Sequence, residues 1–393
     1  MLILGVAILF WGSFALLFWT YFGYPLLMYV RAKGTPAKTA VTETIEPTVT
    51  MLIPTYNEAD VIRRKLENSV AIDYPEDKLD IFVIDDDSTD GTQAIVEEFA
   101  PRVTLIRKPE RTGKMGSVNL GMERATSDIV VLSDASPDYE AKSLRILVQP
   151  FTDSEVGVVV GTLAVWDAAN AVAKPAGLYW RYEAALRKWE TKTGNTVAVH
   201  GNMFAIRREI YRPITGKTIN DEFSIAMETM QQGYRVVYEP DAVSYDDASA
   251  HMGDEFNRRV RINAGRYQAL FGAGYLTQAP TFEVAFRLFS HKLLRPLAPI
   301  FMILMLVANV ALATYHWFYQ LSLLGQVGFY GAALVGWILE RQGKKVRLLS
   351  VIYFFVSSNV AALFGLWRWL SGTQSVTWRK RTAETNTDTT TVG

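Results

Sequence analysis

DIFVIDDDSTDGT, residues 80–92, passes from an unbroken apolar run directly into acidic and turn-forming residues. The apolar run at 81–84 shows no alternation with polar positions, which predicts a strand buried on both faces of a sheet. Three aspartates then fall where this strand ends, and Ser88, Thr89 or Asp90 can cap a short helix after them. A buried strand, terminal acids and a following helix are typical of an α/β domain.

Further apolar strands and helical patterns surround this stretch. The expected strands are VTMLIPT, VTLIRK and DIVVLSD, and the helical segments are NEADVIRRKLENSV and GSVNLGMERA. Continuous apolar strands joined by helices indicate a parallel sheet covered on both faces. The sequence therefore predicts one α/β domain in the middle of the chain.

Polar residues gather where three of these strands end. They are Thr55, Tyr56, Asn57 and Glu58 after the first strand, Asp85, Asp86 and Asp87 after the second, and Asp134 and Ser136 after the fourth. Because open α/β sheets bind ligands at the carboxyl ends of their strands, these clusters predict a binding site.

A nucleotide at this site would have to be held without the usual glycine-rich loops. Neither G-x-G-x-x-G nor G-x-x-x-x-G-K-[ST] occurs in the chain. Carboxylates suit ribose hydroxyls and base N–H groups because each accepts two hydrogen bonds. Lys114 precedes an expected helix, whose unpaired N–H groups favour an anion, so it suits a diphosphate. The alternative is an ordinary solvated loop lysine.

Composition excludes several classes of protein. Lys+Arg 40 and Asp+Glu 40 give a formal net charge of +0, which argues against a nucleic-acid partner. There is no cysteine, so no disulfide, thiolate metal site or cysteine nucleophile exists.

Long uncharged segments lie at both ends of the chain. They are 2–30, 296–315, 317–339 and 348–367. Each reaches the ~20 apolar residues that a spanning helix needs. The first lacks the basic start and small-residue cleavage site of a signal peptide, so we predict a retained transmembrane helix at 1–30, followed by a linker at 31–48.

Basic residues beside these segments predict their orientation. Arg31, Lys33 and Lys38 follow the first segment, which places the soluble domain in the cytoplasm. The basic loop 341–347 and the basic tail at 379–381 both favour the cytoplasm, which is inconsistent with a full crossing by 348–367. That segment is re-entrant, lies flat, or precedes a tail that breaks the rule. We expect a C-terminal transmembrane region at 296–370 and a polar, disordered tail at 371–393.

Residues 281–295 predict an amphipathic helix next to the second apolar segment. Glu283, Arg287, His291 and Arg295 are spaced four apart and form one stripe, opposite Phe282, Phe286, Phe289 and Leu293. This pattern favours a helix in the headgroup plane of a membrane. The alternative is an amphipathic helix packed on the soluble domain.

The motifs resemble, in order, those of family 2 glycosyltransferases. They are PTYNE (54–58), VIDDDSTDGT (83–92), Gly113-Lys114 with Asn119, LSDAS (132–136), VHGNMFAIRRE (199–209), INDEFSIAMETMQQGYRVVYEPDAVSY (219–245) and RRVRINAGRYQAL (258–270). With the apolar ends, the chain is similar to the membrane-bound synthases of cellulose, hyaluronan and poly-N-acetylglucosamine. The resemblance implies a Rossmann-like GT-A domain at 49–280 with a mostly parallel sheet, in a multi-pass protein of the cell (inner) membrane.

The resemblance also implies roles for individual residues. Donor-binding residues would be Thr55, Tyr56, Asn57, Glu58, Asp85, Asp86, Lys114, Asp134, Arg258 and Arg261. Among these, Asp85 or Asp86 would contact the uracil side, Asp134 the ribose and metal, and Lys114 the diphosphate. Glu222 takes the position of the catalytic base, with Asp221 beside it. Gly201, Asn202, Ile262 and Tyr267 would line the acceptor site.

Two positions depart from the family pattern. The second acid of the D-x-D motif is Ser136, so metal ligation by Asp134 and Ser136 is weakened, and Mg²⁺ or Mn²⁺ remains the expected cofactor. The tryptophan of the Q-x-x-R-W motif is Ile262, which offers no π-face to a sugar ring, and nearby Tyr267 is a candidate substitute.

The sequence therefore predicts inverting transfer from a UDP-sugar to a polysaccharide or lipid-linked saccharide at the cytoplasmic membrane face. Membrane lipids and polysaccharide export proteins are the partners that this implies. One alternative is a catalytically silent subunit that binds nucleotide-sugar or glycan. Another is a nucleotidyltransferase, which would release pyrophosphate and does not require apolar segments.

Overall fold

The computed structural model describes residues 1–36, 44–167, 172–173, 178–214, 218–247, 252–344 and 346–374. Most of the predicted tail at 371–393 and part of the linker at 31–48 lie outside the described residues.

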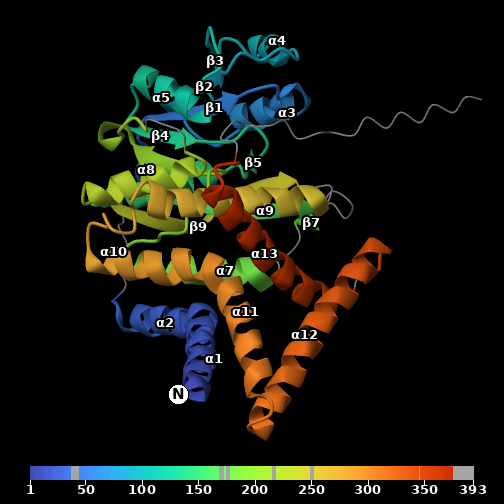
Figure 1. The fold of residues 1–393 in the computed structure, drawn as a ribbon. Coiled ribbons are helices and arrows are strands. Elements are labelled where there is room, and N and C mark those ends of the chain that lie inside the picture. The colour runs from blue at the N-terminus through green and yellow to red at the C-terminus, as the bar shows by residue number, and fades with distance from the viewer. Residues whose placement is uncertain are drawn as a thin grey trace, which may run out of the picture.

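The centre of the molecule is one β-sheet, whose first half is parallel (Figure 1). Strand β1 (Val49–Thr55) lies between β2 (Leu79–Asp85) and β4 (Ile129–Leu132), and β3 (Val103–Arg107) pairs with β2. Every side chain of β1 is buried, as expected for a strand covered on both faces. The predicted α/β class and these strands are confirmed.

The second half of the sheet is mixed. The order of strands is β3-β2-β1-β4-β8-β6-β9-β5. The added strands are β5 (Asp138–Tyr139), β6 (Val156–Asp167), β7 (Val172–Ala173), β8 (Phe204–Arg207) and β9 (Arg235–Asp247). Strand β8 is antiparallel to β4 and β6, whereas β9 is parallel to β6. The alternation of strands and helices that predicted a parallel sheet extends only over the first four strands, and the pairings among these four are parallel. The later strands pair in both directions.

Helices cover the two faces of the sheet and form separate cores. One face carries α3 (Ala59–Val70), α4 (Thr92–Glu97) and α6 (Ser143–Val148), and the other carries α5 (Lys114–Arg124) and α8 (Asp221–Gln231). Met51 of β1 belongs to the first core and its neighbour Leu52 to the second, as alternation along a strand requires. The N-cap of α4 is Gly91, which makes no side-chain cap bond, so the prediction of Ser88, Thr89 or Asp90 as the cap is wrong. Asp90 lies one residue earlier and accepts a hydrogen bond from the Thr92 backbone N–H (3.1 Å).

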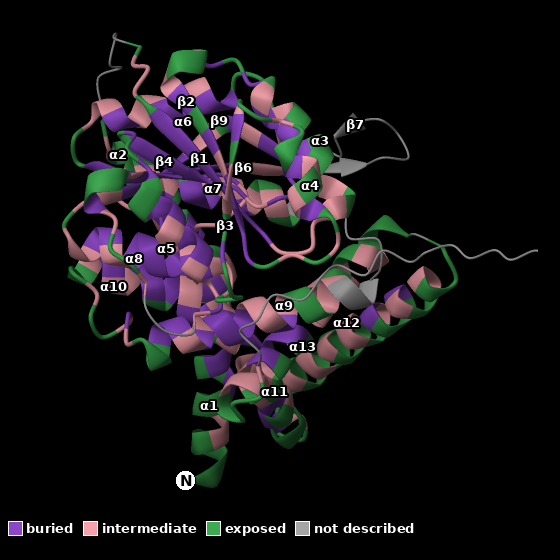
Figure 2. Cartoon of the chain, turned by 90° about the horizontal axis from the view of Figure 1, so that it is seen from above, coloured by how far each residue is buried: buried purple, intermediate pink, exposed green. Residues whose placement is uncertain are grey.

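Among the described residues, four helical stretches have the length and composition to cross a membrane. They are Leu2–Gly34, Phe282–Leu312, Trp317–Arg341 and Arg347–Leu370. Figure 2 shows buried residues concentrated in the sheet and its helices, whereas α1 is largely exposed or intermediate. Large apolar side chains such as Phe22 and Leu324 are more than half exposed, which is typical of surfaces that meet lipid rather than water.

Two of these stretches bend at π-helical turns. Helix α1 (Leu2–Phe18) passes through a turn at 19–23 into α2 (Tyr24–Gly34), and α10 (Phe282–Arg287) passes through a turn at 288–293 into α11 (Leu294–Leu312). In Figure 1, α2 and α10 run across beneath the sheet domain, while α1 and α11 point away from it. The apolar run at 2–30 is therefore not one straight helix.

The last apolar helix returns to the sheet domain. Helix α12 (Trp317–Arg341) precedes α13 (Arg347–Leu370), and α13 packs along α9 (Met252–Tyr267). A Cβ atom at Gly365 would lie 2.9 Å from the backbone oxygen of Val260, so the two helices approach closely at this glycine. Arg259 of α9 also donates a hydrogen bond to Ser358 Oγ (2.6 Å).

The predicted polar stripe at 281–295 contacts the sheet domain. Its partner is α7 (Leu178–Lys192), whose Glu183 and Glu190 carboxylates lie within hydrogen-bond distance of the two ring nitrogens of His291 (3.0 and 2.8 Å). Arg287 is fully buried and Arg295 pairs with Glu183. Because the two glutamates lie two turns apart on one side of α7, they offer this stripe a matching row of charge. On the other side, Phe282 is 85% exposed and Phe289 43% exposed. The alternative of packing on the soluble domain therefore describes the stripe better.

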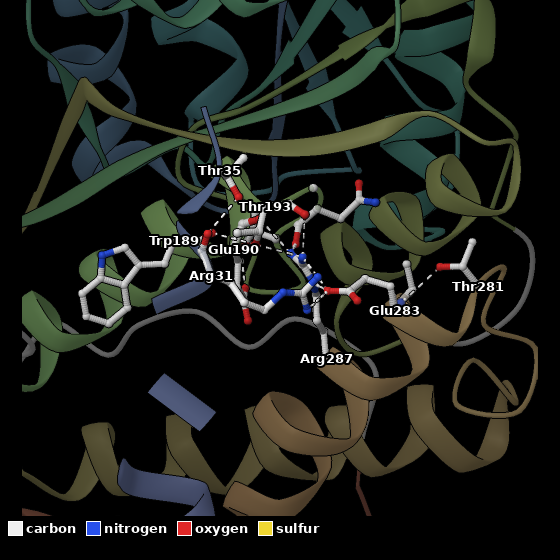
Figure 3. Close-up of polar contacts among 12 residues, drawn as sticks. Arg31, Thr35, Trp189, Glu190, Thr193, Thr281, Glu283 and Arg287 are labelled. Atoms are coloured by element: carbon white, nitrogen blue, oxygen red, sulfur yellow. Dashed lines mark hydrogen bonds and ion pairs between the residues drawn. The ribbon is translucent and has the colours of Figure 1, made fainter. Parts of the chain in front are cut away.

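Arg287 is the centre of this contact (Figure 3). Its guanidinium donates to the backbone oxygens of Glu190 (2.7 Å) and Thr193 (2.9 Å) and to Glu283 Oε1 (2.8 Å). Glu283 also pairs with Arg31 of α2 (2.8 Å), where both side chains are more than a third exposed. Arg287 thus joins the start of the second apolar stretch to the sheet domain.

Arg287→Met is expected to lower the free energy of unfolding by about 3–5 kcal/mol, because it leaves buried acceptors without their donor. Arg31→Met removes only an exposed pair and should cost less than about 1 kcal/mol. Unfolding of both variants in one neutral detergent checks this difference. Equal losses in the two variants would contradict the assignment of Arg287 as the main link.

Candidate active site

The carboxylates after β2 hold the surrounding loops in place. Asp85 accepts hydrogen bonds from the backbone of Ser88 (3.0 Å) and from Gln93 Nε2 (2.6 Å). Asp86 accepts from the backbone N–H groups of Thr112 (2.9 Å) and Gly113 (2.8 Å) and pairs with Lys108. Asp86 therefore positions the loop that leads into Lys114. Its contact with the nucleobase of the donor stays a prediction.

The residues after β1 pack against the loop that follows β2. The backbone N–H of Asn57 donates to Ser88 Oγ (2.9 Å), and its side-chain oxygen accepts from the Thr89 N–H (2.8 Å). Asn57 takes a positive φ of 55°, which asparagine tolerates better than most residues. The guanidinium of Arg111 lies over the ring of Tyr56, 3.6 Å from its centroid. The Glu58 N–H donates a hydrogen bond to Thr92 Oγ1 (2.9 Å). Thr55 is fully buried at the strand end.

Lys114 connects the donor side of the site to the predicted base. Its ammonium donates to Asp134 Oδ1 (2.8 Å) and to Glu222 Oε1 (2.6 Å). Lys114 begins α5, Asp134 follows β4 and Glu222 lies in the first turn of α8, so three elements converge on one cation. Burial alone would lower the pKa of Lys114, but Asp134 and Glu222 outweigh it and raise that pKa.

A glycine lets the predicted base approach the loop before β8. A Cβ atom at Gly201 would lie 2.0 Å from Glu222 Oε1, so no larger residue fits without moving the carboxylate. The backbone oxygen of Asn202 accepts a hydrogen bond from the Tyr139 hydroxyl (3.0 Å). The predicted acceptor residues Gly201 and Asn202 therefore lie beside the base.

The two adjacent acids of α8 differ in their protonation. Burial and the charge of Glu222 raise the pKa of Asp221 to about 7, against the opposing charge of Lys114. Burial would raise the pKa of Glu222 as well, but the charge and hydrogen bond of Lys114 hold it below its ordinary value. Glu222 is therefore ionised near neutral pH, whereas Asp221 holds its proton up to about pH 7.

Asp221→Asn is expected to raise the unfolding temperature at pH 8 and to leave it unchanged at pH 4. The folded protein holds a proton on Asp221 up to about pH 7, whereas an unfolded aspartate loses it near pH ~4. This group therefore costs stability progressively as the pH rises through that window. A pH series of thermal unfolding measures the effect. Glu222→Gln is the matched control with opposite sign, because a lowered pKa stabilises the folded state above pH ~4.

Helix α3 fixes the loop that carries Asp134 and Ser136. Arg64 donates to the backbone oxygen of Ser136 (3.0 Å), and buried Lys65 donates to that of Pro137 (2.7 Å) and lies over the Tyr139 ring (4.1 Å). Burial lowers the pKa of Lys65 to about 7. The backbone of Ser136 is thus held from α3.

The residues predicted on α9 are brought to the site only in part. Arg261 lies close enough that its charge lowers the pKa of Asp221, and the backbone oxygen of Ile262 accepts from Asn220 Nδ2 (3.1 Å). Arg258 is half-exposed and pairs with Glu255 on its own helix. The described contacts do not join Arg258 to Lys114, Asp134 or Glu222.

Tyr267 corrects one prediction. It is fully buried, donates to the backbone oxygen of Pro296 (2.8 Å) and stacks on Trp369 with ring centroids 5.9 Å apart. Its ring faces are covered by protein, so Tyr267 cannot replace the missing acceptor tryptophan. Helix α13 covers this end of α9, and no sequence pattern near residue 267 predicts that cover.

Sequence reasoning also missed residues that the site uses. Lys108 pairs with Asp86, Lys65 supports the loop after Asp134, and Arg111 lies on Tyr56. Lys108 and Lys65 have at most 9% of their surface exposed. A lysine at a predicted strand end or on an apolar helix face is the signal that could have identified them, because buried lysines need a partner.

A divalent ion fits this site only if a bound diphosphate supplies some of its ligands. Among the residues that the structure describes, no three His, Asp or Glu side chains form a metal-binding group. Asp134 is the one carboxylate of the shortened D-x-D motif, and its Oδ1 accepts a hydrogen bond from Lys114. The donor set therefore fits an ion whose remaining oxygen ligands come from a diphosphate.

Comparisons with known proteins agree with this geometry. Residues 50–215 match the model of the family described as Glycosyl transferase family 2. The chain is 28% identical over 234 residues to a probable glycosyltransferase, YdaM, of Bacillus subtilis (strain 168), covering 56% of this chain and 55% of that protein. It is 23% identical over 229 residues to the poly-beta-1,6-N-acetyl-D-glucosamine synthase of Staphylococcus aureus (strain MSSA476), again covering 56% and 55%. The chain thus spans about half the length of the curated relatives it matches.

A solved structure covers more of the chain. The mannosyltransferase PcManGT from Pyrobaculum calidifontis, in complex with GDP-Man and Mn²⁺, superposes with a TM-score of 0.70 and 27% identity. The match covers 92% of this chain and 99% of that one, so it includes apolar helices as well as the sheet domain.

Proposed function

We propose that this chain, which carries a glycosyl transferase family 2 domain of GT-A fold, moves a sugar from a nucleoside diphosphate to an acceptor hydroxyl at a membrane. The observation that carries the proposal is the Lys114 ammonium between Asp134 and Glu222 (2.8 and 2.6 Å). These three groups come from separate motifs and meet at the carboxyl edge of the sheet, where α/β folds bind ligands. The cation that would bind the diphosphate is therefore in direct contact with the proposed base.

The donor would lie across the ends of β1, β2 and β4. The uridine of a UDP-sugar would contact the loops that carry Tyr56 and Asp85, and its ribose would approach Asp134. Lys114 and the first N–H groups of α5 would bind the diphosphate, because a helix start favours an anion. The PcManGT structure contains GDP-Man, so guanine is the base against which uracil has to be tested.

Glu222 would act as the general base of an inverting transfer. It takes the proton of the acceptor hydroxyl while that oxygen forms a bond to the anomeric carbon. The bond from the anomeric carbon to the diphosphate oxygen breaks on the opposite side, and the nucleoside diphosphate leaves with the electron pair. Lys114 and Arg261 would stabilise the charge that grows on this leaving group. A Mg²⁺ or Mn²⁺ ion held by Asp134 and the diphosphate would add Lewis-acid stabilisation of the same charge.

The protein would lie in the cell (inner) membrane with its sheet domain in the cytoplasm. The basic residues after the first apolar stretch support this orientation. The packing of α13 on α9 supports the alternative in which 348–367 lies along the membrane surface. In that arrangement the loop at 341–347 and the tail share the cytoplasmic side. A polysaccharide or a lipid-linked saccharide would be the acceptor, and export proteins would follow if the product is a polymer.

A panel of radiolabelled UDP- and GDP-sugars on the purified full chain, with products sized on a gel, tests this function. Metal-dependent release of the nucleoside diphosphate together with a labelled product is expected. A ladder indicates polymerisation, and one lipid-soluble band indicates a single transfer. Binding of a nucleotide-sugar with no turnover would favour the silent subunit, which Ser136 and Ile262 motivate. Release of pyrophosphate would favour a nucleotidyltransferase.

A further inference from the structure

Polar side chains next to the proposed base lack the hydrogen bonds that buried groups normally make. Both ring nitrogens of His200 are buried without a partner among the described residues, and so is Nε of Arg187 on α7. Lys292, in the π-helical turn at 288–293, has the ring of Phe223 as its described direct contact (5.4 Å). Because buried polar groups are almost always satisfied, the His200 ring and Arg187 Nε call for an absent partner.

His200 lies beside Glu222, because a Cβ atom at its neighbour Gly201 would be 2.0 Å from Glu222 Oε1, and the charges of Arg187 and Lys292 act on the His200 ring. Burial and the charge of Arg187 lower the pKa of His200 to about 3, Glu222 acts against this, and the charge of Lys292 adds to it. His200 is therefore neutral and offers one N–H donor and one acceptor. Phe223, which Lys292 contacts, directly follows Glu222 in α8. The charge of Arg266 also acts on Lys292.

The acids in this region already have other partners. Glu183 pairs with Arg295 and lies 3.0 Å from His291 Nε2, and Glu190 lies 2.8 Å from His291 Nδ1 and accepts from the Tyr24 hydroxyl (2.5 Å). Arg187 Nε stands 4.0 Å from Glu183 Oε1, beyond hydrogen-bond distance. Arg187 is 8% exposed, and Lys292, which is partly buried, joins no described ion pair. These two side chains are therefore the ones that a bound anion would contact.

We propose that Lys292, Arg187 and His200 form a subsite for the phosphoryl group of a phosphorylated lipid-linked acceptor. The inference rests on the proposed sugar transfer and adds the chemistry of its acceptor. A guanidinium, an ammonium and a neutral imidazole N–H together match the oxygens of a phosphate, which accepts several hydrogen bonds and carries negative charge.

The position of Lys292 identifies a lipid as the source of this phosphate. Lys292 lies in the stretch Phe282–Leu312, one of the four that could cross a membrane, and α11 begins two residues later. Arg287, His291 and Arg295 of this stretch bind the sheet domain, whereas Lys292 joins no described ion pair, so Lys292 is the ionisable residue here that favours a functional role. A phosphate held there would place its lipid chain along α11 and its saccharide toward Glu222.

Binding of phosphates to the full chain in a neutral maltoside detergent tests the subsite. The probes are dodecyl phosphate, inorganic phosphate and dodecanol, measured by isothermal titration. We expect dodecyl phosphate to bind at least tenfold more tightly than either other probe. Lys292→Met should weaken this binding at least tenfold, whereas Lys292→Arg should keep it within about threefold. Lys188→Met is the matched control, because Lys188 is the exposed neighbour of Arg187 on α7.

Separate measurement of nucleotide-sugar binding distinguishes the two proposals. It should be unchanged in every variant, which also reports that each one is folded. If Lys292→Met loses it, Arg187→Gln replaces that variant. Dodecyl phosphate binding that survives both Lys292→Met and Arg187→Gln would overturn the subsite even if sugar transfer is found. Inorganic phosphate binding as tightly as dodecyl phosphate would overturn the lipid source. A wild-type chain that binds dodecyl phosphate but no nucleotide-sugar would overturn the proposed function instead.

Discussion

Glu222→Gln is expected to lower the rate of sugar transfer by about 10²–10⁴-fold, the usual contribution of a general base. Glutamine keeps the length of the side chain and an oxygen for Lys114, but it cannot take the proton of the acceptor hydroxyl. The lowered pKa of Glu222 means that the wild-type group is already a carboxylate at neutral pH. The loss should therefore appear in kcat, with little change in the KM for the nucleotide-sugar.

Glu228→Gln is the control for this change. Glu228 lies on the same helix, where it accepts a hydrogen bond from the Tyr275 hydroxyl (3.3 Å) away from Lys114. Its activity should remain within about twofold of the wild type. Single-turnover rates for both variants, beside their nucleotide-sugar affinity, provide the comparison. Near-normal turnover in Glu222→Gln would show that another group is the base.

Lys114→Met should reduce transfer by at least about 10²-fold and weaken the binding of a nucleoside diphosphate. Removal of one preorganised donor to a developing negative charge typically has an effect of this size. The structure adds a second cause, because Asp134 and Glu222 then face each other without the cation between them. Lys114→Arg retains the charge and should recover part of the activity.

Competition by UDP and by uridine separates the role of Lys114 from a general loss of structure. Lys114→Met should weaken UDP far more than uridine, because uridine has no diphosphate. Lys142→Met changes an exposed lysine at the start of α6 and should affect neither ligand. An equal loss of UDP and uridine affinity in Lys114→Met would contradict the proposed diphosphate contact.

The first four strands could be predicted because their signal is local. Buried parallel strands such as 81–84 are continuously apolar, and each ends in polar residues. Beyond residue 132 the strands pair in both directions, and strand direction depends on connections that no local pattern specifies. The family comparisons confirm the fold that the motifs predicted.

The candidate site shows the same division between local and distant information. The roles of Lys114 and Glu222 followed from their motifs, but their contact joins residues 108 positions apart. Tyr267 was a candidate to replace the missing tryptophan because nothing near it in the sequence fixes its direction, and its cover, Trp369, lies a hundred residues later. The stripe from Glu283 to Arg295 was recognised as one helix face, whereas its partner α7 became visible only in three dimensions. Charges that pair between distant segments produce no recognisable pattern in the sequence of either segment alone.

The buried contact between α7 and the stripe at 281–295 limits how the protein can be divided. A shortened chain that stops near residue 280 would keep Glu183 and Glu190 in α7 but lose His291, Arg287 and Arg295. Glu190 would then keep only neutral donors and Glu183 only Arg187, 4.0 Å away, and poorly compensated interior charges usually cost several kcal/mol each. We therefore expect the sheet domain to fold poorly when it is cut from the apolar helices. Biochemical work with a water-soluble fragment would examine a different molecule, and solubilisation has to keep the apolar helices attached.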